Sequence, residues 1–166
     1  RNAGKSSVVN RVTGQTLSIV SDVKGTTTDP VQKAMELLPI GPVVIIDTPG
    51  IDDEGTLGEE RVRRALRVLE KTDIAVLVTD STRGLQPAEQ ELIELFRKRE
   101  IPFVIAHNKA DLTSVPASVP ENEIYVSAAA DSNIRELKEL IARAVKPTEP
   151  EKRLVADLLA PNDTVV

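Results

Sequence analysis

Short apolar runs recur along the chain, and each is followed by polar residues or by glycine. They cover residues 43–46, 74–78, 103–107 and 124–126. Their nearly continuous apolar character predicts strands buried on both faces, as in a parallel sheet. Residues 31–37 instead alternate roughly as a half-exposed strand does, and Gly41-Pro42 separates them from 43–46. These two segments therefore predict an antiparallel hairpin.

The segments between the runs show helical spacing. Residues 59–71 place apolar residues on one face and arginines outside, which is typical of a solvated helix, although such arginines also suit a partner. Pro87 is predicted to begin a second helix, and residues 133–145 a third. The apolar stripes are Val62, Ala65, Leu66 and Leu69, then Leu92, Ile93 and Phe96, then Ile134, Leu137, Leu140 and Ile141. Helices that alternate with strands in this way predict an α/β fold.

The first seven residues carry the second half of a phosphate-binding loop, G-x-x-x-x-G-K-[ST]. In such a loop backbone N–H groups wrap the phosphates, a lysine reaches the terminal ones and the serine hydroxyl ligates Mg²⁺. The predicted lysine is Lys5 and the Mg²⁺ ligand is Ser6. We expect the first glycine and its preceding strand to be missing from the sequence. The predicted phosphate-binding residues are Asn2, Ala3, Gly4, Lys5, Ser6 and Ser7.

Two further segments favour a Mg²⁺–nucleotide site. Asp47-Thr48-Pro49-Gly50 follows an apolar run, where Asp47 can hold a Mg²⁺-bound water and Gly50 can approach the phosphates. Alone, it also fits an ordinary Pro-Gly turn. In the loop 25–30, Thr27 can complete the Mg²⁺ shell and sense the terminal phosphate. Alone, that loop also fits a threonine-rich turn.

The segment Asn108-Lys109-Ala110-Asp111 selects the base. The Asp111 carboxylate can accept hydrogen bonds from N1–H and N2–H₂ of guanine, whereas adenine would present an acceptor to it. Ser127, Ala128 and Ala129 follow the next strand, and small residues there let the backbone approach the base. His107, which precedes Asn108, is interpreted as a strand-end residue. The ordered set of motifs therefore predicts a guanine nucleotide as ligand.

These five elements resemble the signature of translation-factor-class small GTPases. The resemblance extends to about residue 146 and implies a P-loop NTPase G domain that binds GTP or GDP with Mg²⁺ and hydrolyses GTP. It implies a mostly parallel central sheet with one antiparallel edge strand and helices on both faces. We expect residues 1–146 to form this domain and 147–166, which are rich in proline and charge, to form a linker.

Residues 18–22 and 25–27 resemble the Era and MnmE (TrmE) group. That resemblance implies a K⁺ ion bound by Asn2 and by backbone carbonyls near Ser21 and Val23, where it would offset developing charge. The alternative is that Asn2 only caps the loop through side-chain to backbone hydrogen bonds. Lys5 and Thr27 are expected to act in catalysis.

Ile51 stands where Ras-like enzymes carry a water-orienting glutamine. Isoleucine has no donor or acceptor, so another group must orient the water or hydrolysis is slow. Glu59 falls where MnmE-like proteins keep a catalytic glutamate. The alternative is that Glu59 is a first-turn helix acid, favoured by the helix dipole.

The tail and residues 52–55 resemble HydF, the maturation GTPase of [FeFe]-hydrogenase. This resemblance implies hydrogenase and the other maturation proteins as partners, a homodimer formed through absent regions, and an Fe–S cluster in an absent downstream region. Two alternatives stay open: an Era- or MnmE-type GTPase in ribosome assembly or tRNA modification, and a nucleotide sensor that does not hydrolyse GTP.

The amino-acid composition limits the kinds of site and partner that this chain can have. The 166 residues include no cysteine and carry a net charge of −5, which argues against direct, broad nucleic-acid binding. The absence of cysteine excludes a disulfide or a thiolate metal site in these residues. No apolar stretch reaches membrane-spanning length, and we expect a cytoplasmic protein without membrane contact. Only 2% of residues are aromatic, so the core must be built from aliphatic side chains.

Overall fold

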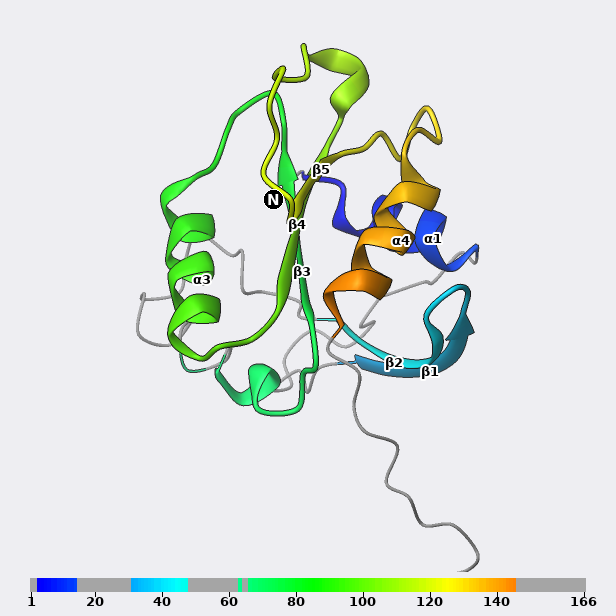
Figure 1. Cartoon of the computed structure of the whole chain (residues 1–166), viewed down its shortest axis with the longest axis vertical. Helices are drawn as coiled ribbons and strands as arrows, with labels where there is room; N and C mark the ends of the chain where they lie inside the picture. The colour runs from blue at the N-terminus through cyan, green and yellow to red at the C-terminus, as the bar shows by residue number, and fades with distance from the viewer. Residues whose placement is uncertain (1–2, 15–30, 48–62, 64–65, 146–166) are drawn as a thin grey trace, which may run out of the picture.

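A three-stranded parallel sheet lies between helices on its two faces (Figure 1). The structure is a computed structural model that describes residues 3–14, 31–47, 63 and 66–145. The sheet has the order β3 (Ala75–Asp80), β4 (Phe103–Asn108) and β5 (Glu123–Tyr125). The register pairs Asp80 with Asn108, so the carboxyl ends of β3 and β4 lie side by side. Parallel strands bring their terminal side chains to one edge in this way.

Helices α1 (Lys5–Thr13) and α4 (Ile134–Ala144) cover one face, and α3 (Pro87–Lys98) covers the other (Figure 1). Alternate residues of β4 divide the core between the two layers. Val104 and Ala106 pack with α1 and α4, whereas Ile105 packs with α3. The strands are therefore buried on both faces, which explains their continuous apolar character.

Helix α3 begins where its sequence provides a suitable first turn. Pro87 occupies the first turn of α3, and Gln86 and Glu89 form a reciprocal capping box there. Helix α4 buries its entire expected stripe, consisting of Ile134, Leu137, Leu140 and Ile141. Residues 66–69 are also helical, and a 3₁₀ turn, η1 (Ala110–Leu112), follows β4.

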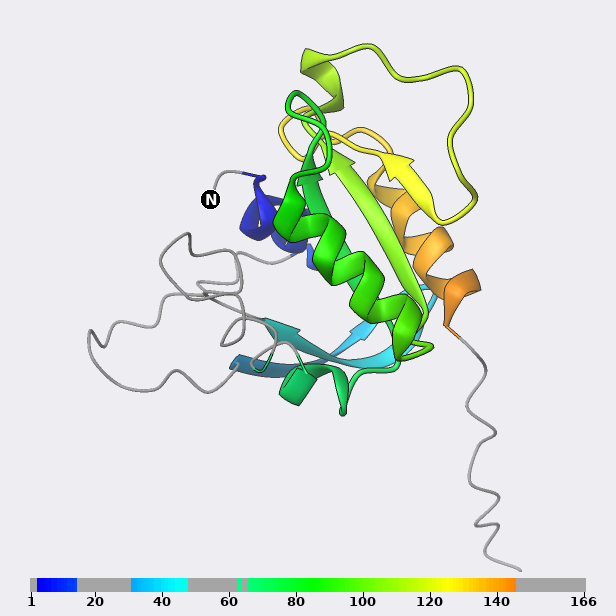
Figure 2. The same cartoon turned by 90° about the vertical axis from the view of Figure 1, so that its left-hand side faces the viewer.

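A separate antiparallel hairpin is formed by β1 (Val31–Leu37) and β2 (Gly41–Asp47). In Figure 2 it runs beneath the parallel strands, while α3 lies in front of them. Among the described residues no ladder joins the hairpin to the parallel sheet. A cavity of about 2050 Å³ lies between them, lined by Val43 and Ile45 of the hairpin and by Ala75 and Leu77 of β3.

The expected fold class is confirmed, with one difference in detail. We predicted one central sheet with an antiparallel edge strand, whereas the described strands form two sheets. The cavity separates the hairpin from β3, whereas strands must lie within about 5 Å of each other to share hydrogen bonds. No helix in the described ranges is both long and apolar enough to cross a membrane. Residues 59–62 and 64–65 of the predicted helix 59–71, and the whole linker 147–166, lie outside the described residues.

Candidate functional site

The residues of the predicted phosphate-binding loop lead directly into α1. Gly4 is the N-cap residue, with φ 78° and ψ 30°, and its carbonyl accepts a hydrogen bond from Val8 N at 2.9 Å. Lys5, Ser6 and Ser7 form the first turn, in which Ser6 and Ser7 are exposed. Backbone N–H groups at a helix N-terminus are a favourable place for phosphate.

Asn108 connects this loop to the segment after β5. Its side chain is buried, Nδ2 donates to the Ala3 carbonyl at 2.8 Å, and Oδ1 accepts from Ala128 N at 3.0 Å. A Cβ atom at Gly4 would collide with Asn108 Nδ2, so the close approach of the two segments requires glycine. The last residue of β4 thus joins two motifs that lie more than a hundred positions apart in the chain.

The Asp111 carboxylate is oriented by a serine. Ser127 Oγ donates to Asp111 Oδ1 at 2.5 Å and accepts from Ala130 N at 3.0 Å. Ser127 is buried, whereas Asp111 is exposed at the pocket. The buried serine therefore holds the exposed carboxylate at the pocket rather than in the core. Ser127 therefore has a function that the sequence pattern did not specify, beyond its small size.

One hollow of about 550 Å³ brings most of the predicted nucleotide-binding residues together. Its volume lies within the range usual for small-molecule sites. The predicted residues that line it are Gly4, Ser7, Asn108, Lys109, Asp111, Ser127, Ala128 and Ala129. Ala3, Lys5 and Ser6 line the adjoining end of the larger cavity, which also includes Gly4 and Lys109. The phosphate-loop residues and the base-selecting residues thus form one continuous region.

Other predicted site residues lie outside the described part of the chain. They are Asn2, Ser21, Val23, Thr27, Gly50 and Glu59. Asp47 ends β2, opposite Val31, but its side chain is not among those described. The roles predicted for these residues stay predictions.

The donor atoms at this site suit Mg²⁺. The hydroxyl group of Ser6 is exposed in the first turn of α1, and hydroxyl and carboxylate oxygens are hard ligands of the kind that Mg²⁺ prefers. No group of three or more histidine, cysteine or acid residues suited to a metal occurs among the described residues.

Three polar contacts at the site were missed by the sequence analysis. Arg11 Nε donates to the Ala128 carbonyl at 2.9 Å. This hydrogen bond joins α1 to residues 127–129 after β5, which we call the base segment. Lys109 Nζ donates to Asp80 Oδ2 at 2.5 Å. Burial raises the pKa of the Asp80 carboxyl group, but hydrogen bonds from Lys109 and Thr82 outweigh this and lower the pKa to about 2. Asp80 is therefore an anion at neutral pH.

The third contact surrounds His107. We interpreted it as a strand-end residue without a catalytic or metal-binding partner. It is buried in β4, with Nδ1 2.8 Å from Thr79 Oγ1 and Nε2 2.7 Å from Glu123 Oε2. Its ring stacks on Tyr125, with centroids 4.6 Å apart. The side chain therefore joins β3, β4 and β5 beneath the site, a structural function that short-range sequence spacing cannot indicate.

Comparison with known proteins agrees with this geometry. The sequence profile of the family described as "50S ribosome-binding GTPase" matches residues 1–109. The tRNA modification GTPase MnmE of Legionella pneumophila (strain Paris) is 36% identical over 152 residues, which are 89% of this chain and 34% of that protein. GTPase Der of Maridesulfovibrio salexigens is 42% identical over 118 residues, which are 68% of this chain and 26% of that protein.

The fold is also similar to a solved structure. A variant of Aquifex aeolicus Era bound to GDP·AlF₄⁻ superimposes with a TM-score of 0.66 and 28% identity, over 89% of this chain and 55% of that one. This chain spans about a third of the length of the MnmE relatives. Nothing in these comparisons specifically indicates a HydF-type maturase. The family match, the P-loop fold and the assembled motifs agree, and the chain belongs to the 50S ribosome-binding GTPase family, whose members hydrolyse GTP.

Proposed function

We propose that this chain is the GTP-hydrolysing switch domain of an MnmE- or Era-type protein that acts on RNA, and that tRNA modification is its role. The observation that carries the nucleotide assignment is the exposed Asp111 carboxylate, oriented by Ser127 in a pocket that Asn108 joins to the phosphate loop. Similarity to MnmE over 89% of the chain supports the biological role. This reverses our preference for HydF, which rested on residues 52–55 and on the tail, all outside the described residues.

Base recognition follows from the chemistry of the pocket. Asp111 accepts from N1–H and N2–H₂ of guanine, while Ser127 keeps its carboxylate in one orientation. The Ala128 N–H is already bonded to Asn108 Oδ1, so the base segment is fixed before a ligand arrives. A preorganised site does not have to order these groups on binding.

The phosphates lie against the N-terminus of α1 in this proposal. Lys5 offsets charge on the terminal phosphates. Ser6 and Thr27 would hold Mg²⁺ directly, and Asp47 would hold it through a bound water. When bound, Mg²⁺ neutralises charge on the β- and γ-phosphates. Water attacks the γ-phosphate, and GDP and inorganic phosphate leave. Glu59 is proposed to orient that water, because Ile51 lacks a polar group.

A monovalent cation is part of the proposal. Asn2, with carbonyls near Ser21 and Val23, would hold K⁺, which supplies positive charge beside the bridging oxygen when bound. We expect the full-length protein to hydrolyse GTP at least ten-fold faster in potassium chloride than in sodium chloride at equal ionic strength, because the smaller ion fits such a site poorly. Phosphate release measured in both salts tests this. Equal rates would remove the K⁺ assignment and leave the nucleotide site untouched.

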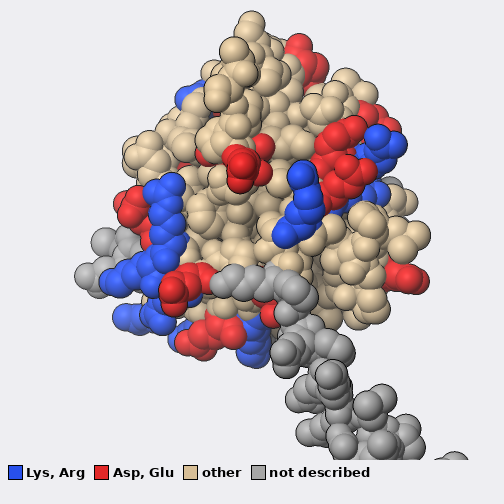
Figure 3. Space-filling model, viewed as in Figure 1, with Lys and Arg blue, Asp and Glu red and all other residues tan. Residues whose placement is uncertain are grey.

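The RNA role is tested by direct binding. We expect the full-length protein to retain tRNA in a filter-binding assay, with an affinity that differs between the GTP-bound and GDP-bound states. The net charge of −5 and the interspersed charges on the face seen in Figure 3 indicate that RNA is held mainly outside this chain. A protein that binds no tRNA but shows the visible absorbance of an Fe–S cluster after anaerobic purification would contradict the proposal and favour the HydF alternative.

A further inference from the structure

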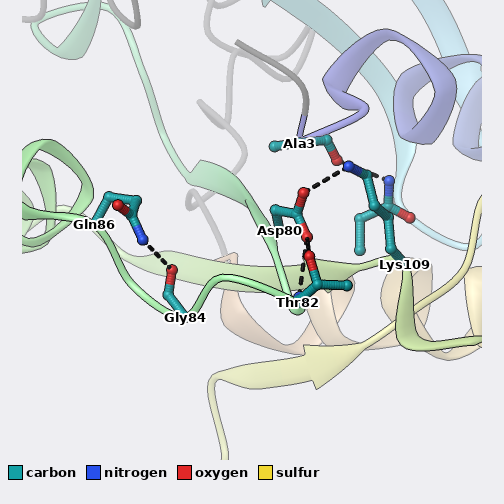
Figure 4. A network of polar contacts seen from close by, with 7 residues as sticks. Ala3, Asp80, Thr82, Gly84, Gln86 and Lys109 are labelled. Carbon is teal, nitrogen blue, oxygen red and sulfur yellow. Dashed lines mark hydrogen bonds and ion pairs between the residues drawn. The ribbon is translucent and has the colours of Figure 1, made fainter. Parts of the chain in front are cut away.

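An ion pair joins the end of β3 to the residue that follows β4 (Figure 4). Lys109 Nζ lies 2.5 Å from Asp80 Oδ2, and the two side chains are 31% and 12% exposed. The register places Asp80 opposite Asn108, the residue before Lys109. Both partners are therefore held at the same sheet edge as the nucleotide pocket, and limited exposure protects the pair from screening by salt.

Asp80 is fixed by contacts that do not involve the pocket. Its Oδ1 accepts hydrogen bonds from Thr82 N at 3.0 Å and from Thr82 Oγ1 at 2.6 Å (Figure 4). Its backbone carbonyl accepts from Arg83 N at 3.1 Å. One carboxylate oxygen thus anchors the side chain, and the other is presented to Lys109.

The loop that supplies these anchors is itself fastened to α3. Gln86 Nε2 donates to the carbonyls of Arg83 and Gly84, at 3.0 and 3.1 Å. The Gln86 N–H donates to Glu89 Oε2 at 2.8 Å, within the capping box of α3. The position of Asp80 is consequently set by the scaffold and does not depend on a bound nucleotide.

Lys109 carries the longer side chain of the pair, with more rotatable bonds than Asp80. Its backbone adopts the left-handed conformation, with φ 65°, between the buried Asn108 and the 3₁₀ turn η1. Its side chain lines both the 550 Å³ pocket and the larger cavity. Lysine is among the side chains that lose most conformational entropy when they become ordered. A carboxylate that already holds the ammonium group reduces that loss at the moment of ligand binding.

We propose that Asp80 is a positioning residue for nucleotide binding, which holds Lys109 in the lining of the nucleotide pocket so that the lysine is ordered before guanine nucleotide arrives. This inference rests on the proposed function of the pocket. Asp80 itself contacts Lys109 and Thr82 and need not touch the ligand. Replacement of Asp80 should therefore weaken nucleotide binding, and it should do so only when Lys109 is present.

The test is a double-mutant cycle on the full-length protein. Asp80→Asn keeps the shape of the side chain and an oxygen that can accept hydrogen bonds from Thr82. It replaces the charged oxygen that faces Lys109 with a neutral NH₂ group. We expect this variant to bind GDP and GTP about ten-fold more weakly, with kcat at saturating GTP within two-fold of wild type. Lys109→Met should have an effect of at least that size. Adding Asp80→Asn to Lys109→Met should lower the nucleotide affinity by less than a further two-fold.

The matched control is Asp73→Asn. Asp73 is an exposed acid just before β3, and its replacement should leave the affinity for GDP and GTP unchanged.

The results of these titrations distinguish failure of the Asp80 inference from failure of the proposed function. Unchanged affinity in Asp80→Asn, or losses that multiply in the double variant, would overturn the positioning role, since a purely structural effect does not depend on Lys109. If wild type does not discriminate GDP from ADP, the proposed function fails and this inference with it. If wild type discriminates and Asp80→Asn binds as wild type does, the inference fails alone.

Discussion

Replacement of Asp111 by asparagine is expected to change the preferred nucleotide from guanine to xanthine. The carboxylate accepts two hydrogen bonds from guanine, whereas an amide offers one acceptor and one donor, and the donor would face N2–H₂. Xanthine carries a carbonyl oxygen at that position and can accept from the amide. Since hydrogen bonds to charged groups contribute about 1.5–3 kcal/mol each, we expect GDP affinity to fall by at least about 100-fold. Competition titrations of the full-length protein with GDP and XDP measure both changes.

The matched control for this substitution is Asp131→Asn. Asp131 is also an exposed acid on the loop between the base segment and α4, and its nearest ionic contact is Arg11 at 3.9 Å. Its φ of 54° suits asparagine as well as aspartate. GDP affinity should stay within two-fold of wild type in the control. Tight GDP binding by Asp111→Asn would refute the assigned base contact.

Replacement of Asn108 by alanine is expected to damage both stability and binding. It removes the hydrogen bonds to the Ala3 carbonyl and from the Ala128 N–H, and Ala128 is buried. An unsatisfied buried polar group costs about 1–3 kcal/mol, so a loss of about 2–4 kcal/mol in the free energy of unfolding is expected. The phosphate loop and the base segment would also lose their common support. We therefore expect GDP affinity to fall more than about 100-fold.

Calorimetric melting and GDP titration of the full-length protein test the Asn108 prediction. Asn122→Ala is the control, because Asn122 contacts β4 through its backbone carbonyl, which accepts a hydrogen bond from Ile105 N at 2.9 Å and survives the substitution. The control should retain wild-type affinity. If Asn108→Ala melts and binds GDP as the control does, the coupling of the two motifs through this side chain is wrong.

Local patterns predicted most of the fold because each strand and helix carries its own signal. The run 103–107 and the stripe of Leu137 and Ile141 depend only on which neighbours are apolar, and both were confirmed. The division into two sheets was not predicted, because strand pairing is set by distance in space. The motifs likewise identified the pocket, since a phosphate loop and a base-selecting segment act largely through residues adjacent in sequence.

The supporting contacts were not predicted, because they depend on register and packing. Asp80 reaches Lys109 only because β3 and β4 pair in parallel with Asp80 opposite Asn108. Arg11 reaches Ala128, which lies 117 positions away in the chain, because α1 packs beside α4. No spacing of residues in the sequence predicts contacts of this kind. The HydF hypothesis failed to gain support for another reason: it relied on two short segments, residues 52–55 and the tail, which carry little information about fold.

The central claim is that the pocket around Asp111 and Asn108 selects a guanine nucleotide. Equilibrium titration of the full-length protein with GDP and with ADP, in Mg²⁺ and potassium chloride, tests it most directly. The proposed site predicts at least about 100-fold tighter binding of GDP, because adenine meets the Asp111 carboxylate with an acceptor. Equal affinities for GDP and ADP would contradict the claim.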